Sequence, residues 1–181
     1  MNRSIQWLVS ALLVATASGC GGASETGASA PANPASLVGN PAPGFRVKTV
    51  TGSKATVSLK ELRGQVVLLD FWGTFCEPCK KSFPKLEALQ SKYGGNGLRI
   101  IGVSEDEGED KDKIPAFADT YGAKFALAWD ADKSIARDYK PETMPSSFII
   151  DKEGVVRFAH VGFHDGEEVE IDKEIRGLLG P

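Results

Sequence analysis

The sequence predicts an α/β domain in which a central mixed β-sheet is flanked by helices. Residues 65–71 and 98–104 are continuous apolar runs, which is typical of strands buried on both faces of a sheet. A helical pattern follows each run, and the chain then ends with a pair of strands and a last helix. This order of elements predicts a layered α/β sandwich.

Turn and cap residues set the limits of the predicted elements. Gly64 ends a helical turn, Gly94 ends the long helix, and Asp132 is predicted to cap a short helix. In chain order, we expect an N-terminal β-hairpin of 45–50 and 55–59, a helical turn at 59–63, a strand at 65–71, a helix at 78–93, a strand at 98–104, an insert with a helix at 111–121 and a short strand at 125–129, a short helix at 132–139, a hairpin of 146–151 and 155–161, and a closing helix at 166–179.

The composition limits the possible classes of function. The chain has 181 residues, of which 41% are hydrophobic and 25% charged, so one domain can bury an ordinary core. Its net charge is −3 and the sequence has no basic stripe, which argues against nucleic acid as a partner. Three cysteines are too few for a disulfide scaffold, and the odd number indicates that one has a separate role.

The first residues are predicted to be a targeting segment. Residues 1–19 combine a positive start at Arg3 with an apolar run at 5–17, as a secretory signal peptide does, and the run is too short to span a bilayer. Residues 20–38 are rich in Gly, Ala, Ser and Pro, which predicts a flexible linker. We therefore expect export from the cytoplasm and a folded domain at 39–181.

Cys20 directly follows the small residues that end this apolar run. The stretch 17–20 resembles a bacterial lipobox, with Ala17 where that pattern prefers Leu. The resemblance implies that Cys20 is lipidated and that its acyl chains anchor the protein to a membrane. Ordinary cleavage, with Cys20 a free thiol in the linker, is the alternative.

Cys76 and Cys79 form a C-x-x-C motif where a buried strand meets a helix. Unpaired amides and the helix dipole stabilise a thiolate at a helix N-terminus, which predicts Cys76 as the nucleophile. Cys79 is predicted to resolve the mixed disulfide, and Pro78 suits the first helical turn. A zinc site is the alternative, but it needs four ligands, and the chain has no second cysteine pair and only His160 and His164.

The segment LLDFWGTFCEPCKKSFP resembles the active site of thioredoxin-like proteins, and is most similar to extracytoplasmic thiol–disulfide oxidoreductases of the TlpA/ResA type. The TMPSSF segment at 143–148 is similar to the family's cis-proline loop, the turn at 151–154 to its hairpin, and residues 111–129 to its insert. The resemblance extends over 39–179. It implies a thioredoxin fold and an activity that exchanges disulfides with other proteins.

The resemblance implies roles for individual residues. Pro145 would be the cis-proline facing the cysteine pair, with the Met144 backbone pairing with the substrate chain; an ordinary proline at a strand entry is the alternative. Asp70 interrupts an apolar run, so we expect a buried carboxyl with a raised pKa. It matches the acid that exchanges a proton with Cys79 in thioredoxins. A strand-end carboxylate bonded to backbone is the alternative.

Further residues near the motif are predicted to contact substrate or to tune the cysteine pair. The predicted contacts are Trp72, Phe75, Glu77, Pro78, Thr143 and Met144. Phe75 replaces the Trp usual in the family, and Ser82 stands where many ResA-like proteins carry a glutamate. The negative charge of Glu77 disfavours the Cys76 thiolate, which predicts a reduction potential nearer about −270 mV than about −120 mV.

The predicted function is reduction of disulfides in exported proteins such as apocytochrome c, as in cytochrome c maturation, or metal-site proteins, with electrons from a membrane thiol donor. We expect a monomeric periplasmic or cell-surface lipoprotein that needs no metal, and no cofactor beyond its own disulfide.

A peroxiredoxin-like peroxidase is one alternative, although it requires two residues between Thr and the reactive cysteine, and only one separates Thr74 from Cys76. A copper-binding assembly factor, which uses C-x-x-x-C, is a second alternative and is not an enzyme. A binding module whose cysteine site is vestigial is a third alternative.

The remaining polar residues are interpreted as surface groups. The charged run at 105–113 is predicted to be a solvated loop. His160 and His164 are predicted to lie on the surface at strand ends, and Trp129 in the core.

Overall fold

A computed structural model describes residues 34–180, which form a five-stranded mixed sheet in the order β5–β4–β3–β6–β7 and a separate sheet of β1 and β2. The strands are β1 (Arg46–Lys48), β2 (Thr56–Ser58), β3 (Val66–Trp72), β4 (Leu98–Ser104), β5 (Ala126–Trp129), β6 (Ser146–Ile150) and β7 (Val156–Val161). The helices are α1 (Glu77–Tyr93), α2 (Ile114–Tyr121), α3 (Ser134–Tyr139) and α4 (Glu167–Leu179), with short 3-10 helices at Pro34–Leu37, Leu59–Leu62, Gly94–Asn96 and Gly108–Lys113.

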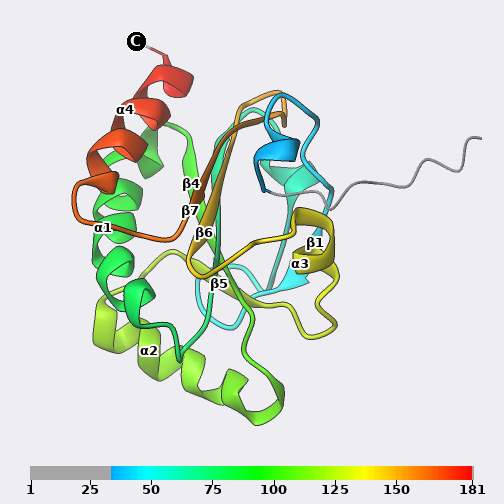
Figure 1. The fold of residues 1–181 in the computed structure, drawn as a ribbon, viewed down its shortest axis with the longest axis vertical. Coiled ribbons are helices and arrows are strands. Elements are labelled where there is room, and N and C mark those ends of the chain that lie inside the picture. The colour runs from blue at the N-terminus through cyan, green and yellow to red at the C-terminus, as the bar shows by residue number, and fades with distance from the viewer. Residues whose placement is uncertain (1–33, 181) are drawn as a thin grey trace, which may run out of the picture. The chain divides into compact units, whose positions relative to one another are not determined.

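Helices cover both faces of the central sheet. α1 and α4 lie side by side on one face with α2 at the end of their layer, and α3 and the β1–β2 hairpin lie on the other face (Figure 1). Because side chains alternate along a strand, β3 contributes to both layers. Leu68 and Trp72 pack in the core beneath α1, whereas Leu69 and Phe71 pack in the core beneath α3. All seven residues of β3 are therefore buried.

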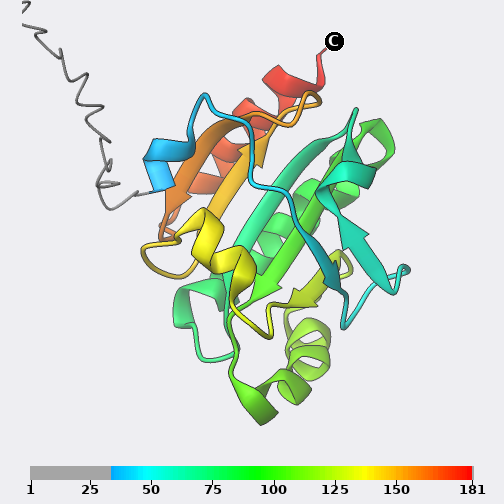
Figure 2. The ribbon, with the colours of Figure 1, turned by 90° about the vertical axis from the view of Figure 1, so that its right-hand side faces the viewer.

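The direction of the strands changes inside the sheet, at the central strand β3. β3 pairs in parallel with β4 on one side and antiparallel with β6 on the other. Figure 2 shows this sheet with α3 and the hairpin in front of it. In α/β proteins, ligand sites form at the carboxyl ends of strands beside such a change. The loop that carries the C-x-x-C motif follows the carboxyl end of β3, beside this change of direction.

The predicted α/β architecture is confirmed, including the N-terminal hairpin and the insert between β4 and α3. Two helix starts differ from the prediction by two residues or more. The helix expected at 111–121 begins as a 3-10 helix at Gly108 and becomes α-helical at Ile114. The helix expected at 132–139 begins at Ser134 and its N-cap is Lys133, so the prediction of Asp132 as the cap is wrong, although Asp132 Oδ1 accepts the Ser134 N–H at 3.1 Å.

Within residues 34–180, no helix is long and apolar enough to cross a bilayer. The signal peptide predicted at 1–19 and the lipidation predicted at Cys20 lie outside the residues that the structure describes.

Candidate active site

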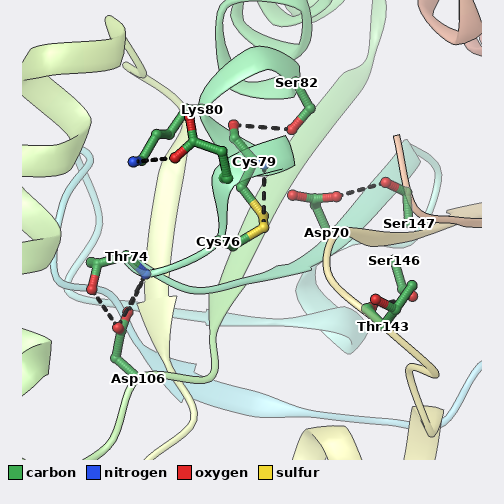
Figure 3. The surroundings of a disulfide bond; sticks show 11 residues. Asp70, Thr74, Cys76, Cys79, Lys80, Ser82, Asp106, Thr143, Ser146 and Ser147 are labelled. Carbon is green, nitrogen blue, oxygen red and sulfur yellow. Dashed lines mark hydrogen bonds and ion pairs between the residues drawn. A yellow bond between two sulfur atoms is a disulfide. The ribbon is translucent and has the colours of Figure 1, made fainter. Parts of the chain in front are cut away.

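Cys76 and Cys79 form a disulfide at the start of α1, with their Cα atoms 5.3 Å apart (Figure 3). Cys76 is the N-cap of the helix, and its sulfur accepts the Cys79 N–H at 3.2 Å. Cys76 keeps 5% of its surface exposed, whereas Cys79 is fully buried. A substrate sulfur can therefore reach only Cys76, and the helix N-terminus stabilises the thiolate that the attack requires.

Asp70 is a fully buried carboxyl in β3, close to the disulfide. Ser147 Oγ–H donates to its Oδ1 at 2.6 Å, whereas Oδ2 has no hydrogen-bond partner among the described residues. In Figure 3, the carboxyl lies between Ser147 and the cysteine pair, and the oxygen without a partner is on the cysteine side. Burial and the nearby charge of Glu167 raise the pKa of Asp70 from 3.8 to about 7, although the Ser147 bond lowers it. The carboxyl can therefore accept and return a proton near neutral pH.

Asp106 holds the loop between β3 and α1 in place. Thr74 donates its backbone N–H to this carboxylate at 3.1 Å and its hydroxyl at 2.6 Å, and the Ser104 hydroxyl donates at 2.6 Å. Asp106 is fully buried and residues 108–113 form a 3-10 helix, so the prediction that 105–113 is a solvated loop is wrong at these positions. A sequence signal existed: parallel strands end at the same edge of a sheet, so an acid just after β4 lies beside the loop that follows β3.

A groove with a volume of about 640 Å³ opens beside Cys76. Five residues singled out from the sequence line it, namely Phe75, Cys76, Pro78, Thr143 and Met144. The Phe75 side chain is 66% exposed, and the Met144–Pro145 peptide bond is cis, as the resemblance implied. Two segments about 65 residues apart in the chain thus meet at one apolar surface next to the reactive sulfur.

Trp72 and Glu77, which were also predicted to contact substrate, do not line this groove. Trp72 is fully buried and packs on Phe83 and Phe117, with ring centroids 4.6 and 4.7 Å away, so it supports the site from the core. The Glu77 side chain is 77% exposed and pairs with Lys80 at 2.5 Å. Glu77 therefore acts on Cys76 only through its charge, which water and Lys80 weaken.

Ser82 lies one turn beyond Cys79, where the family often has a glutamate. It is buried, and its hydroxyl donates to the Cys79 carbonyl oxygen at 3.2 Å. A serine hydroxyl bound in this way does not replace a carboxylate as a proton acceptor.

His160 is largely buried, so its prediction as a surface group is wrong. Its ring lies between two carboxylates of α4, with Nδ1 3.3 Å from Glu167 Oε1 and Nε2 2.7 Å from Glu174 Oε2. The reason is tertiary packing, because α4 covers the end of β7 from which His160 projects. His164 is exposed, as predicted. In the described part of the chain, no group of three or more His, Cys, Asp or Glu side chains is arranged to hold a metal ion.

The fold and the cysteine pair together define a class of protein, an enzyme of thioredoxin fold that exchanges its own disulfide with the thiols or disulfides of other molecules. Comparisons with known proteins agree with this class. A family model described as the AhpC/TSA family matches residues 38–159. The crystal structure assigned to a thiol:disulfide interchange protein DsbE of Chlorobium tepidum is similar, with a TM-score of 0.70, 34% identity, and coverage of 77% of this chain and 96% of that one.

Two curated relatives agree with this class. The chain is 38% identical over 133 residues to the thioredoxin-like protein YneN of Bacillus subtilis (strain 168), covering 73% of this chain and 76% of the relative. It is also 38% identical over 133 residues to the thiol-disulfide oxidoreductase ResA of Bacillus thuringiensis (strain Al Hakam), covering 74% of this chain and 75% of the relative. The chain belongs to the ResA-like thiol–disulfide oxidoreductases within the AhpC/TSA family.

Proposed function

We propose that this thiol–disulfide oxidoreductase works as a reductase of disulfides in exported proteins. The observation that carries the proposal is that the one reachable sulfur, that of Cys76, lies beside an apolar groove that includes exposed Phe75 and half-buried Met144. An apolar groove beside the nucleophile fits an extended segment of a protein better than it fits a small polar disulfide. The dithiol itself carries the two electrons, so the reaction needs no further cofactor.

The reducing direction is supported by the charges around the cysteine pair. A thiolate at Cys76 forms close to the carboxyl of Asp70 and to the carboxylate of Glu77. Negative charges disfavour the thiolate, which stabilises the disulfide relative to the dithiol and lowers the reduction potential. Replacement of Glu77 by His should therefore raise the potential, and an unchanged or lower value would contradict this reasoning.

The residues that precede the domain support the proposed location, and the resemblance to the family supports the proposed partners. The apolar run at 5–17 supports export, and the lipobox-like stretch before Cys20 supports a lipid anchor on the outer side of a membrane. An anchored monomer would receive electrons from a membrane thiol donor and pass them to apocytochrome c or to proteins with metal sites. Mass spectrometry of the membrane fraction would detect acyl chains on Cys20, and an unmodified Cys20 would contradict the anchor.

Peroxidase activity and copper binding are the two alternatives. The Thr74 hydroxyl is already donated to Asp106, so it is not free to orient a peroxide at Cys76. We therefore expect the reduced protein to consume hydrogen peroxide no faster than free thiols do. Titration of the reduced protein with cuprous ions tests the other alternative, and stoichiometric tight binding would support it over the reductase.

The deciding experiment is the reduction potential of the Cys76–Cys79 pair, measured by equilibration of the protein against defined thiol buffers. A value near or below about −270 mV supports a reductase fed by a membrane donor. A value near about −120 mV reverses the direction and makes the protein an oxidant of substrate thiols.

A further inference from the structure

A row of polar side chains crosses the otherwise apolar face of the sheet beneath α1 and α4. Asp70 is paired with Ser147 across β3 and β6, and Ser147 is paired with His160 across β6 and β7. Directly opposite residues in an antiparallel pair share a face, with Cβ atoms about 4.5–5.5 Å apart. Their neighbours along the strands on this face, Leu68 and Ile149, belong to the hydrophobic core. The row therefore runs from the disulfide toward the edge strand β7.

α4 closes the outer end of this row with two acids. Glu167 and Glu174 are seven residues apart and so share one face of the helix. Their side chains are 5% and 12% exposed, and that of His160 between them is 11% exposed. Glu167 Oε2 also accepts the His164 backbone N–H at 3.2 Å.

Both ring nitrogens of His160 lie near carboxylate oxygens of α4, and the contact of Nε2 with Glu174 Oε2 at 2.7 Å is a hydrogen bond. A neutral imidazole has one N–H and could donate to only one of the two carboxylates. Donation to both requires either an imidazolium or a protonated carboxyl. His160 lies directly opposite Ser147 on the neighbouring strand, and Ser147 in turn donates to Asp70.

The groups that face Asp70 and His160 are few in the described structure. Asp70 is opposite Gly102 of β4, so that neighbour adds no charge, and it accepts from Ser147 of β6. Glu167 of α4 is the charged residue that acts on Asp70. His160 in turn faces Glu167 and Glu174, so a change at either Glu167 or His160 alters the charge that Asp70 experiences.

We propose that His160 and Glu167 are positioning residues of the exchange reaction, which set the pH range in which Cys79 can resolve the mixed disulfide by controlling the protonation of Asp70. The proposal rests on the exchange activity of the cysteine pair and not on its direction. In the resolving step, the Cys79 S–H gives its proton to the Asp70 carboxylate. The Cys79 thiolate then attacks Cys76 Sγ, the bond between Cys76 and the substrate sulfur breaks, and the substrate leaves as a thiolate with the electron pair.

The test uses the reduced protein and the aromatic disulfide dithiobis(nitrobenzoate). Attack by Cys76 releases one coloured thionitrobenzoate, and resolution by Cys79 releases a second, so the second phase isolates the step that needs Asp70. The rate of this phase is measured against pH. We expect the midpoint to fall by roughly 0.5–1 pH unit in Glu167→Gln, which removes a negative charge near Asp70. We expect it to rise in His160→Gln, which removes the group that balances that charge.

Glu170→Gln is the matched control, because it makes the same charge change on an exposed position of α4. Its midpoint should equal that of the unmodified protein. Midpoints that stay in place, or that move in the same direction in Glu167→Gln and His160→Gln, would overturn the proposal. A slower second phase with an unmoved midpoint would assign these residues a structural role only.

A second measurement needs no variant and therefore does not depend on folding of the mutants. Carbon NMR of the Asp70 carboxyl in the oxidised protein should show a second inflection at the pH where the His160 ring titrates, and a single inflection would overturn the proposal. A reduction potential near that of an oxidant would reject the reductase direction but leave these results unaffected. No release of thionitrobenzoate at all would reject the exchange activity itself.

Discussion

Asp70 and Asp106 are two fully buried aspartates near the carboxyl ends of neighbouring parallel strands, and their surroundings differ. Asp106 accepts hydrogen bonds from the Thr74 amide, the Thr74 hydroxyl and the Ser104 hydroxyl. Asp70 accepts one, from Ser147, and also faces the charge of Glu167. A buried carboxylate is stabilised by the donors around it. The number of donors, and not burial alone, thus makes Asp106 an anchor for the active-site loop and Asp70 a proton acceptor.

The largest expected difference between the two aspartates is kinetic. Asp70→Asn should slow the second phase of the reaction with dithiobis(nitrobenzoate) by about 100-fold or more, because it removes the proton acceptor for Cys79. Asp106→Asn should slow the same phase less than about tenfold, since the loop keeps an oxygen acceptor. Stopped-flow absorbance measures both variants, and equal slowing would mean that the two acids do not differ in role.

Asp70→Asn should also increase the free energy of unfolding above neutral pH. The pKa of Asp70 is about 7 in the folded protein, compared with 3.8 for an ordinary aspartate, so the folded chain binds more protons between these values and loses stability as the pH rises through this window. The shift corresponds to about 4 kcal/mol at pH above about 8. Asn does not titrate, so Asp70→Asn should gain up to about this amount there and much less below about pH 4. Urea unfolding at several pH values measures the difference, and a constant difference across the range would contradict it.

Asp106→Ala should change stability in the opposite direction. It leaves the Thr74 N–H and the Ser104 hydroxyl without their acceptor in the interior, which costs about 3 kcal/mol of the free energy of unfolding. Asp112→Ala is the control, because Asp112 belongs to the same charged run but has a side chain 76% exposed. Asp112→Ala should change the free energy of unfolding by no more than about 0.5 kcal/mol. Similar losses in the two variants would show that Asp106 does not anchor the loop.

The smallest expected effect concerns an exposed carboxylate. Glu77→Gln should raise the reduction potential by about 10–20 mV, because it removes a negative charge that disfavours the Cys76 thiolate. The change is small since Glu77 is 77% exposed and paired with Lys80. Lys80→Gln should move the potential slightly down. Equilibration against thiol buffers measures both, and a shift in Glu77→Gln as large as that caused by a buried charge would contradict the distinction between exposed and buried acids.

The sequence by itself determined the features that depend on near neighbours in the chain. The C-x-x-C spacing places two cysteines one helical turn apart, and the apolar run around Asp70 is enough to predict a buried carboxyl. The segment around Pro145 was predicted from its resemblance to a known loop, and its cis bond is confirmed. The first two depend on spacing or hydrophobicity that a short segment shows on its own, and the third depends on the resemblance of a short segment to a known family.

Only the tertiary structure decided which distant residues surround that site. His160 is in register with Ser147, and Ser147 with Asp70, through pairings that join β3 to the β6–β7 hairpin. Asp106 meets Thr74 because β3 and β4 are parallel and end at the same edge. The pattern around His160 is that of an ordinary surface residue, and the position of Asp106 just after β4 indicates only the edge of the sheet at which it lies. Strand register and the docking of a helix bury such residues, and these depend on the packing of the whole domain and not on the local sequence.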